Sequence, residues 1–277
     1  MLIFASMEGL FTQMARAFIS TPPLWTRSQF GLQQFPFPEI DLARVKPVTF
    51  GSSMRLGHKM ERIFTALLEG QDTYELIMEN VVIKKDKKTL GEIDFLLKDL
   101  RNDRQLHLEL TYKFYLADTD ISEPIFRLVG PNRRDMFYTK LEKLRESQLT
   151  LPHTIEGTKT LRAMEMEPEF LEQQVCFKAQ LFRPYRSARL GIRPLNKSCI
   201  AGTWMRFQDF ESAGFKTHQY YFPSKDEWVI SPYNTADWIS HFNALIELNI
   251  RMIKKSSTLV WMRKKEGSLE KFFVVWW

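Results

Sequence analysis

The sequence predicts an α/β fold, because segments with the period of strands and segments with the period of helices share one chain. Residues 90–97 and 106–116 alternate apolar and polar side chains, which is typical of half-buried strands. Over residues 56–68 the apolar residues recur every three or four positions, which is typical of an amphipathic helix. The chain has 277 residues, 44% hydrophobic and 26% charged, so it can bury a sizeable core.

Two helices and one strand are predicted ahead of these two strands. We expect an amphipathic helix over residues 1–20, a second helix over 53–70 and a strand over 74–84. Residues 21–38 are rich in proline and aromatic side chains. Proline cannot donate a backbone hydrogen bond, so we expect this segment to form an extended connector on the surface of the core.

Several features indicate a cytoplasmic protein. The N-terminus lacks a basic segment before a long apolar run, so we expect no secretory signal. No stretch reaches the roughly eighteen apolar residues of a spanning helix, so we expect no membrane partner. Cys176 and Cys199 lack the spacing of a disulfide framework or a zinc site, which favours a reducing compartment.

Strands 90–97 and 106–116 are predicted to form a hairpin that carries three charged side chains on one face. Because side chains alternate along a strand, Asp94 of the first strand and Glu109 and Lys113 of the second lie opposite the apolar faces. Two carboxylates on adjacent strands repel each other unless a cation lies between them. A hard divalent ion such as Mg²⁺ or Mn²⁺ would relieve this repulsion, and the lysine could then polarise water or stabilise charge on a phosphate.

This arrangement resembles the PD-(D/E)XK nuclease superfamily, whose signature is an Asp on one strand and Glu-x-Lys on the next. Four segments are similar, more closely, to a bacterial family of unknown function, DUF1853, which has been grouped with those nucleases by remote similarity. The segments are Gly91–Leu97, Leu106–Leu116, Gly130–Asp135 and Lys140–Leu144. The resemblance implies a restriction-endonuclease-like core, in which a mixed central β-sheet is flanked by helices.

The resemblance also implies roles for individual residues. Asp94 and Glu109 would hold the metal, with the carbonyl of Leu110 completing the set. Lys113 would act on water or phosphate. Glu61, on the helix before the hairpin, would assist; the alternative for Glu61 is a surface residue beside its basic neighbour.

One departure from the superfamily signature concerns the lysine. The usual lysine position is Thr111, and Lys113 follows two residues later on the same strand face. The site could therefore retain its chemistry with a displaced lysine, or bind without cutting. The alternative from spacing alone is a solvated strand face with a cross-strand ion pair.

Basic residues after the hairpin are candidates for binding a phosphate backbone. The net charge of +6 is compatible with a nucleic-acid partner, although it falls short of a dedicated basic stripe. A helix is predicted from about residue 133 to 148, and Asn132, Arg133 and Lys140 are our candidates for phosphate contacts. The alternative is a solvated face whose basic residues pair with glutamates of the same helix.

The last third of the chain is rich in aromatic residues, and six of the seven tryptophans follow residue 200. Because large aromatic side chains bury so much area, we expect core and interface here rather than a base-stacking surface. We expect strands over 174–182, 203–206 and 228–230 and a long helix over 236–254.

Three consecutive parts are therefore predicted. Residues 1–50 form the N-terminal helix and connector, residues 51–200 the nuclease-like core, and residues 201–277 an aromatic-rich α+β extension packed on that core.

The sequence favours a metal-dependent nuclease that hydrolyses phosphodiester bonds in DNA, with RNA as the less favoured substrate. The main alternative is a catalytically inactive nucleic-acid or protein interaction module on the same scaffold. A third is a structural protein whose aromatic C-terminal part forms a dimer interface, and a homo-oligomer is compatible with the sequence.

Overall fold

The structure of the protein is a computed structural model that describes residues 2–187, 189–233 and 236–277, with side chains described from residue 9 onward in the first helix. The chain divides into two compact units, and strands β5 and β7 each supply residues to both. The first unit comprises Met1–Tyr112, Thr139–Lys178 and Pro194–Asn196, and the second Lys113–Tyr138, Ala179–Arg193 and Lys197–Trp277.

Six α-helices and twelve strands are present in the described residues. The helices are α1 (Leu2–Ser20), α2 (Leu56–Glu69), α3 (Phe137–Lys143), α4 (Ile155–Arg162), α5 (Phe207–Ser212) and α6 (His241–Ile253). The strands are β1 (Ser28–Gln29), β2 (Leu32–Gln33), β3 (Tyr74–Lys85), β4 (Lys88–Asp99), β5 (Arg104–Ala117), β6 (Leu128–Val129), β7 (Leu171–Pro184), β8 (Ile200–Arg206), β9 (Gln219–Tyr221), β10 (Ile239–Ser240), β11 (Thr258–Arg263) and β12 (Leu269–Val275).

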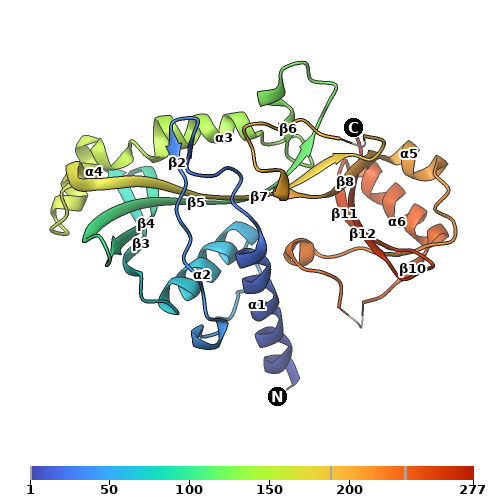
Figure 1. Cartoon of the computed structure of the whole chain (residues 1–277), viewed down its shortest axis with the longest axis horizontal. Coiled ribbons are helices and arrows are strands. Elements are labelled where there is room, and N and C mark those ends of the chain that lie inside the picture. Colours follow the sequence, from blue (N-terminus) through green and yellow to red (C-terminus); the bar gives the residue numbers. More distant parts are fainter. Residues whose placement is uncertain (1, 188, 234–235) are drawn as a thin grey trace. The chain divides into compact units, whose positions relative to one another are not determined.

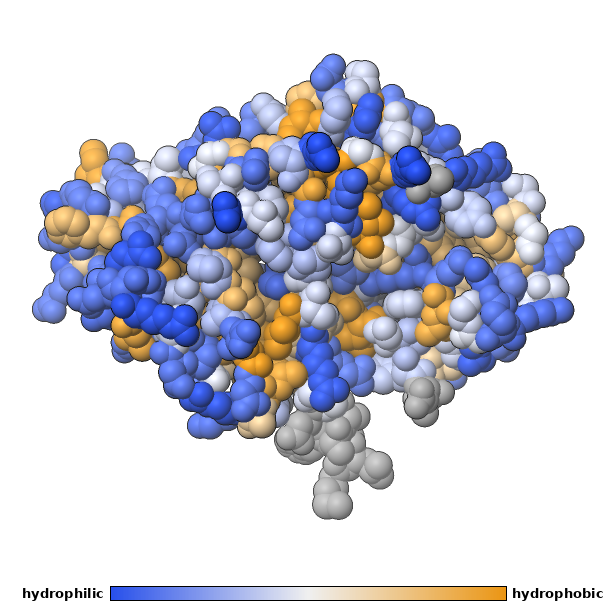
Figure 2. Space-filling view, viewed as in Figure 1, coloured by the Kyte–Doolittle hydropathy of each residue, from blue (hydrophilic) through white to orange (hydrophobic). Residues whose placement is uncertain are grey.

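The strands after β2 form a mixed sheet, and helices flank it, as the sequence predicts. The hydrogen-bonded order is β10-β9-β11-β12-β8-β7-β5-β4-β3, with β6 beside β5. Pairs β3/β4 and β4/β5 are antiparallel, whereas β8 runs parallel to both β7 and β12. Among the described residues, no helix combines the length and apolar character needed to cross a membrane. The face drawn in Figure 2 is mainly hydrophilic, with hydrophobic side chains in separate patches.

In the first unit, the predicted hairpin is strands β4 and β5, with Phe95 opposite Leu108 and Leu97 opposite Leu106. Helices α1 and α2 lie on one side of the strands, and α3 and α4 on the other (Figure 1). Phe64 of α2 packs on the apolar face of the hairpin, with its ring 4.8 Å from that of Phe95. The hairpin is therefore covered on both faces, and its polar face is not the solvated surface that alternation suggests.

The segment over residues 21–38 packs on the core of the first unit, but it is not confined to the surface as predicted, because Leu24, Trp25, Leu32 and Phe35 are buried. Trp25 is fully buried, and its ring centroid lies 5.2 Å from that of Phe177 in β7. The backbone is also paired with β7: Leu24 donates to the carbonyl of Phe177 and Phe35 to that of Val175, each at 2.8 Å. Because these hydrogen bonds satisfy the backbone amides of Leu24 and Phe35, both residues can be buried.

The helix after the hairpin begins later than predicted, at Phe137 rather than near residue 133. Residues 130–135 form a closed turn, in which the amide of Gly130 donates to the carbonyl of Asp135 at 2.8 Å. Arg133 has a left-handed backbone with φ of 54°, which a helix cannot contain. After α3 the chain continues as a π-helical segment, Leu144–Gln148, in which the amide of Leu149 bonds the carbonyl of Leu144 at 2.9 Å.

In the second unit, α5 and α6 pack on strands β8 to β12 around an aromatic and aliphatic core that includes Phe210, Tyr220 and Phe272. Residues 228–230 do not form the predicted strand, because a capping box between Ser224 and Glu227 starts a 3₁₀ turn there. Helix α6 starts at His241, five residues later than predicted, since β10 occupies the preceding positions and Ser240 caps the helix. The hairpin of β11 and β12 escaped prediction.

Candidate functional site

Asp94 and Glu109 face each other just beyond the regular β4/β5 ladder, which ends at Phe95 and Leu108. The Asp94 carboxylate accepts the amide hydrogen of Leu110 at 2.9 Å. The Asp94 amide in turn points at the Glu109 carboxylate, at a long 3.5 Å. Each side chain thus takes a backbone donor from the other strand, and the two carboxylates are held together.

Burial raises the pKa of both carboxyl groups. Burial and the charge of Glu109 raise the pKa of Asp94 to about 8. Burial raises the pKa of Glu109 to about 7, although the charge of Lys140 and hydrogen bonds from Asp94 act in the opposite direction. The pair therefore retains a proton near neutral pH, and a cation would relieve the same repulsion.

His107 is a third member of this site that the sequence analysis left without a role. Its Nε2 lies 3.0 Å from one oxygen of Glu109, and both side chains are fully buried. Burial lowers the pKa of His107 to about 4, so the ring is neutral at physiological pH. A neutral ring that donates from Nε2 fixes the orientation of the Glu109 carboxylate. The signal was present in the sequence, since His107 shares a strand face with Glu109.

Lys140 of α3 and Gln148 of the π-helical segment after it are two further members of the site. The side-chain nitrogen Nε2 of Gln148 donates to the second carboxylate oxygen of Glu109. Lys140 donates to the side-chain oxygen Oε1 of Gln148 at 2.7 Å. The charge of Lys140 lowers the pKa of both Asp94 and Glu109. Gln148 ends the π-helical segment, so its position depends on a distortion that helical periodicity cannot predict.

Glu61 lies close enough to Asp94 for its charge to raise the pKa of that residue. Its own carboxylate accepts a hydrogen bond from Nδ1 of His58 at 2.9 Å, and this contact raises the pKa of the imidazole. Thr111, which occupies the usual lysine position, is buried. Its hydroxyl has no hydrogen-bond partner in the described part of the chain.

Lys113 belongs to the second unit, where its ammonium binds Asp135 at 2.7 Å. Asp135 also accepts the amide of Gly130 through its carbonyl, so Lys113 is tied to the turn ahead of α3. A β-carbon at Gly130 would overlap the Asp135 carboxylate, which is why this turn needs glycine.

Asn132 and Arg133 also make contacts within the second unit. The Asn132 side chain accepts the amide hydrogen of Ser257 at 2.8 Å. Arg133 pairs with the carboxylate of Asp118 and stacks on Trp277, 3.9 Å from the ring centroid. Of the three predicted phosphate contacts, Lys140 is thus the one whose recorded contacts join it to the carboxylate pair.

The donor set suits a hard divalent ion. No group of three or more His, Cys, Asp or Glu side chains in the described residues is arranged to hold a metal. Asp94 and Glu109 provide two carboxylates, and Mg²⁺ is commonly bound by one or two carboxylates with water in the remaining positions. The buried, unpartnered hydroxyl of Thr111 adds a polar group on the same strand face. The carbonyl of Leu110 stays a prediction.

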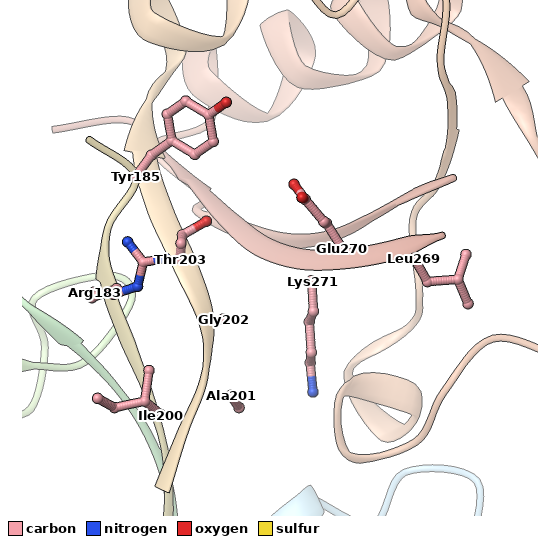
Figure 3. Close-up of a pocket in the computed structure, with 9 residues that line it drawn as sticks. All are labelled: Arg183, Tyr185, Ile200, Ala201, Gly202, Thr203, Leu269, Glu270 and Lys271. Atoms are coloured by element: carbon pink, nitrogen blue, oxygen red, sulfur yellow. The ribbon is translucent and has the colours of Figure 1, made fainter. Parts of the chain in front are cut away.

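A separate hollow of about 390 Å³ lies in the second unit between β8 and β12. Figure 3 shows Glu270 and Lys271 pointing to opposite sides of β12. Burial lowers the pKa of Lys271 to about 7, and its amine donates to Gln180 at 2.6 Å and to the carbonyl of Trp228 at 2.7 Å. These two bonds tie β12 to its neighbours and give the lysine a structural role.

The fold and the site define an α/β protein with a mixed sheet, in which one hairpin carries a carboxylate pair made of a half-buried Asp94 and a buried Glu109. A family model described as "Domain of unknown function (DUF1853)" matches residues 38–275, and the chain belongs to this family. No curated protein and no solved structure matches the chain.

Proposed function

We propose that this protein is a metal-dependent nuclease of the cytoplasm that hydrolyses phosphodiester bonds in DNA, or less readily in RNA, on a restriction-endonuclease-like core. The observation that supports the proposal best is the pair of Asp94 and Glu109 on neighbouring strands, each with a raised pKa. An Asp on one strand and a Glu on the next match the first two positions of the PD-(D/E)XK signature. The burial of the Cys176 and Cys199 thiols is in keeping with a reducing compartment.

In this proposal Asp94 and Glu109 hold Mg²⁺ or Mn²⁺. When bound, the ion would activate water and neutralise charge on the phosphate. The chain itself provides a rigid ligand set: the Leu110 amide anchors Asp94, while His107 and Gln148 each hold one oxygen of Glu109. Ligands fixed in this way need little reorganisation on binding.

We assign the positive charge of the site to Lys140 rather than Lys113. Lys140 is half-buried, bonded to Gln148 and electrostatically coupled to both carboxyl groups. Lys113 instead forms an ion pair with Asp135. A lysine beside the carboxylates can stabilise charge that develops on a phosphate in the transition state.

The test is a cleavage assay on single-stranded, duplex and branched DNA and on matched RNA, with Mg²⁺, Mn²⁺ or a chelator. We expect metal-dependent cleavage by the wild type and its loss in Asp94→Asn and Glu109→Gln. Glu92→Gln removes an exposed carboxylate from the same hairpin and should retain activity. Cleavage that persists in Asp94→Asn, or in the presence of chelator, would overturn the proposal.

A comparison of Lys140→Met with Lys113→Met tests the assignment of the lysine. Loss of a single preorganised charge typically lowers the rate by about 100- to 1,000-fold, and we expect this for Lys140→Met. Lys113→Met should leave cleavage near the wild-type level after correction for any loss of folded protein. The reverse order would return the role to Lys113.

The second candidate is an interaction module without catalysis, which the replacement of the usual lysine by Thr111 favours. Such a protein would bind nucleic acid with an affinity that falls steeply with salt, yet cleave none of the substrates.

A further inference from the structure

Helix α6 presents a row of large apolar side chains to solvent. Phe242, Ile246, Ile250 and Ile253 are 71%, 48%, 44% and 77% exposed. They follow one another at intervals of four, four and three residues, so they form a single stripe along one helix face. The opposite face is buried in the core of the second unit through Ala244 and Leu248. The stripe is thus an outer surface and not part of that core.

The stripe carries no charge, although the whole chain has a net charge of +6. The exposed polar residues among its apolar members are Asn243 and Asn249. Glu247 and Arg251 flank it and neutralise each other in an ion pair of 2.6 Å. Two copies of this surface can therefore approach without the like-charge repulsion expected elsewhere on a basic protein.

The ends of the stripe carry opposite charges. Asp237 is exposed ahead of β10, four residues before the helix begins, and Lys254 is exposed directly after the helix. An antiparallel pair of helices brings each acidic end to the basic end of the other copy, whereas a parallel pair brings like charges together.

We propose that α6 packs antiparallel against α6 of a second copy of this chain. The two-fold axis would cross the exposed stripe at the level of Leu248 along the helix. The spacing of the stripe is nearly the same in both directions from this centre. Ile246 of one copy then meets Ile250 of the other, and Phe242 meets Ile253. A surface that matches itself in this way is what a two-fold dimer requires.

A groove beside the stripe supplies the complementary shape. It has a volume of about 480 Å³, and its apolar wall is formed by Ile246 of α6 and by Phe222 and Ile239 opposite. The charged residues Asp237, Glu247 and Arg251 complete its lining. In the antiparallel pair, Ile253 of the partner copy reaches this N-terminal half of α6. Each copy thus offers both an exposed apolar side chain and a groove to receive one.

The exposed area sets the strength of the pair. Four aromatic or aliphatic side chains at these exposures present roughly 400 Å² per copy, about half of the roughly 800 Å² per partner in a standard interface. We expect a reversible dimer with a dissociation constant in the micromolar range.

Sedimentation of the full chain from about 1 to 200 μM tests the pairing. The wild type should approach twice the monomer mass at the upper end, and Ile250→Glu should stay monomeric. Ile155→Glu alters a residue of α4 that is 85% exposed and should dimerise like the wild type. A wild type that stays monomeric to 200 μM, or an unchanged dimer in Ile250→Glu, would overturn the proposal.

Cysteine cross-linking tests the direction and register of the helices independently. Asn249 lies one residue from the proposed axis. The introduced cysteine of Asn249→Cys should therefore form a disulfide with the same cysteine of a second copy under mild oxidation. Asn243 lies five residues from the axis, which separates its two copies by roughly 15 Å along the helices, so Asn243→Cys should not. The native cysteines Cys176 and Cys199 are buried and should not cross-link between copies. Cross-linking through Asn243→Cys but not Asn249→Cys would refute this arrangement.

Discussion

Metal binding at the carboxylate pair should be linked to proton release. Asp94 and Glu109 have pKa values of about 8 and about 7, so without a metal they share protons around neutral pH. A divalent ion needs both carboxylates ionised and must displace those protons. The affinity for Mg²⁺ or Mn²⁺ should therefore rise with pH until both groups are ionised.

The pKa values set the size of the effect. With values of about 8 and about 7, roughly one-twentieth of the metal-free protein has both groups ionised at pH 7, and nearly all of it at pH 9. The apparent affinity should thus be roughly an order of magnitude higher at pH 9, which corresponds to about 1 to 2 kcal/mol. Binding should release about one proton at pH 7 and almost none at pH 9.

The assay is isothermal titration calorimetry with Mn²⁺ at both pH values, repeated in two buffers of different ionisation enthalpy to count the protons. Asp94→Asn is the matched variant, because its amide oxygen can still accept the Leu110 amide hydrogen while the charge is lost. Removing a mere outer partner of a metal ligand costs about 10- to 100-fold in affinity, so we expect at least about 100-fold here. Glu92→Gln is the control and should bind as the wild type does.

Two results would refute this reasoning. The first is a wild-type affinity that does not change between pH 7 and pH 9, because the carboxylates would then not be the ligands. The second is proton release that persists in Asp94→Asn at the wild-type level.

Three further outcomes concern stability. Gly202→Ala should destabilise by about 3 kcal/mol in urea unfolding, because its methyl group would overlap a backbone carbonyl of β12, whereas Gly214→Ala meets no atom within 4 Å and should be near neutral. Trp25→Ala should cost about 4 kcal/mol in the same experiment, since the side chain is fully buried, and a loss below about 1 kcal/mol would contradict its place in the core. The raised pKa values of Asp94 and Glu109 mean that the folded state binds protons more tightly, so their stabilisation is complete at acidic pH and is lost as pH rises through about 8. The melting temperature of the metal-free wild type should therefore fall more between pH 5 and pH 9 than that of the double variant Asp94→Asn/Glu109→Gln.

The sequence alone determined the elements whose signal is local. The hairpin of β4 and β5 follows from alternation and a polar turn, and α2 follows from an apolar stripe that ends at Gly70. Alternation also predicted that Asp94 and Glu109 share a strand face, because side-chain direction depends only on position along a strand. The family too was recognisable from residues of this region, and the match over residues 38–275 confirms it.

Only the tertiary structure decided what surrounds that pair. Both faces of the hairpin are covered, so Glu109 and His107 are buried and their pKa values shift, which alternation could not show. Lys140 and Gln148 come from a segment more than thirty residues away, and a π-helical turn aims Gln148 at Glu109. Local patterns fix the direction of a side chain from its own strand or helix, but the partners it meets depend on how distant segments pack.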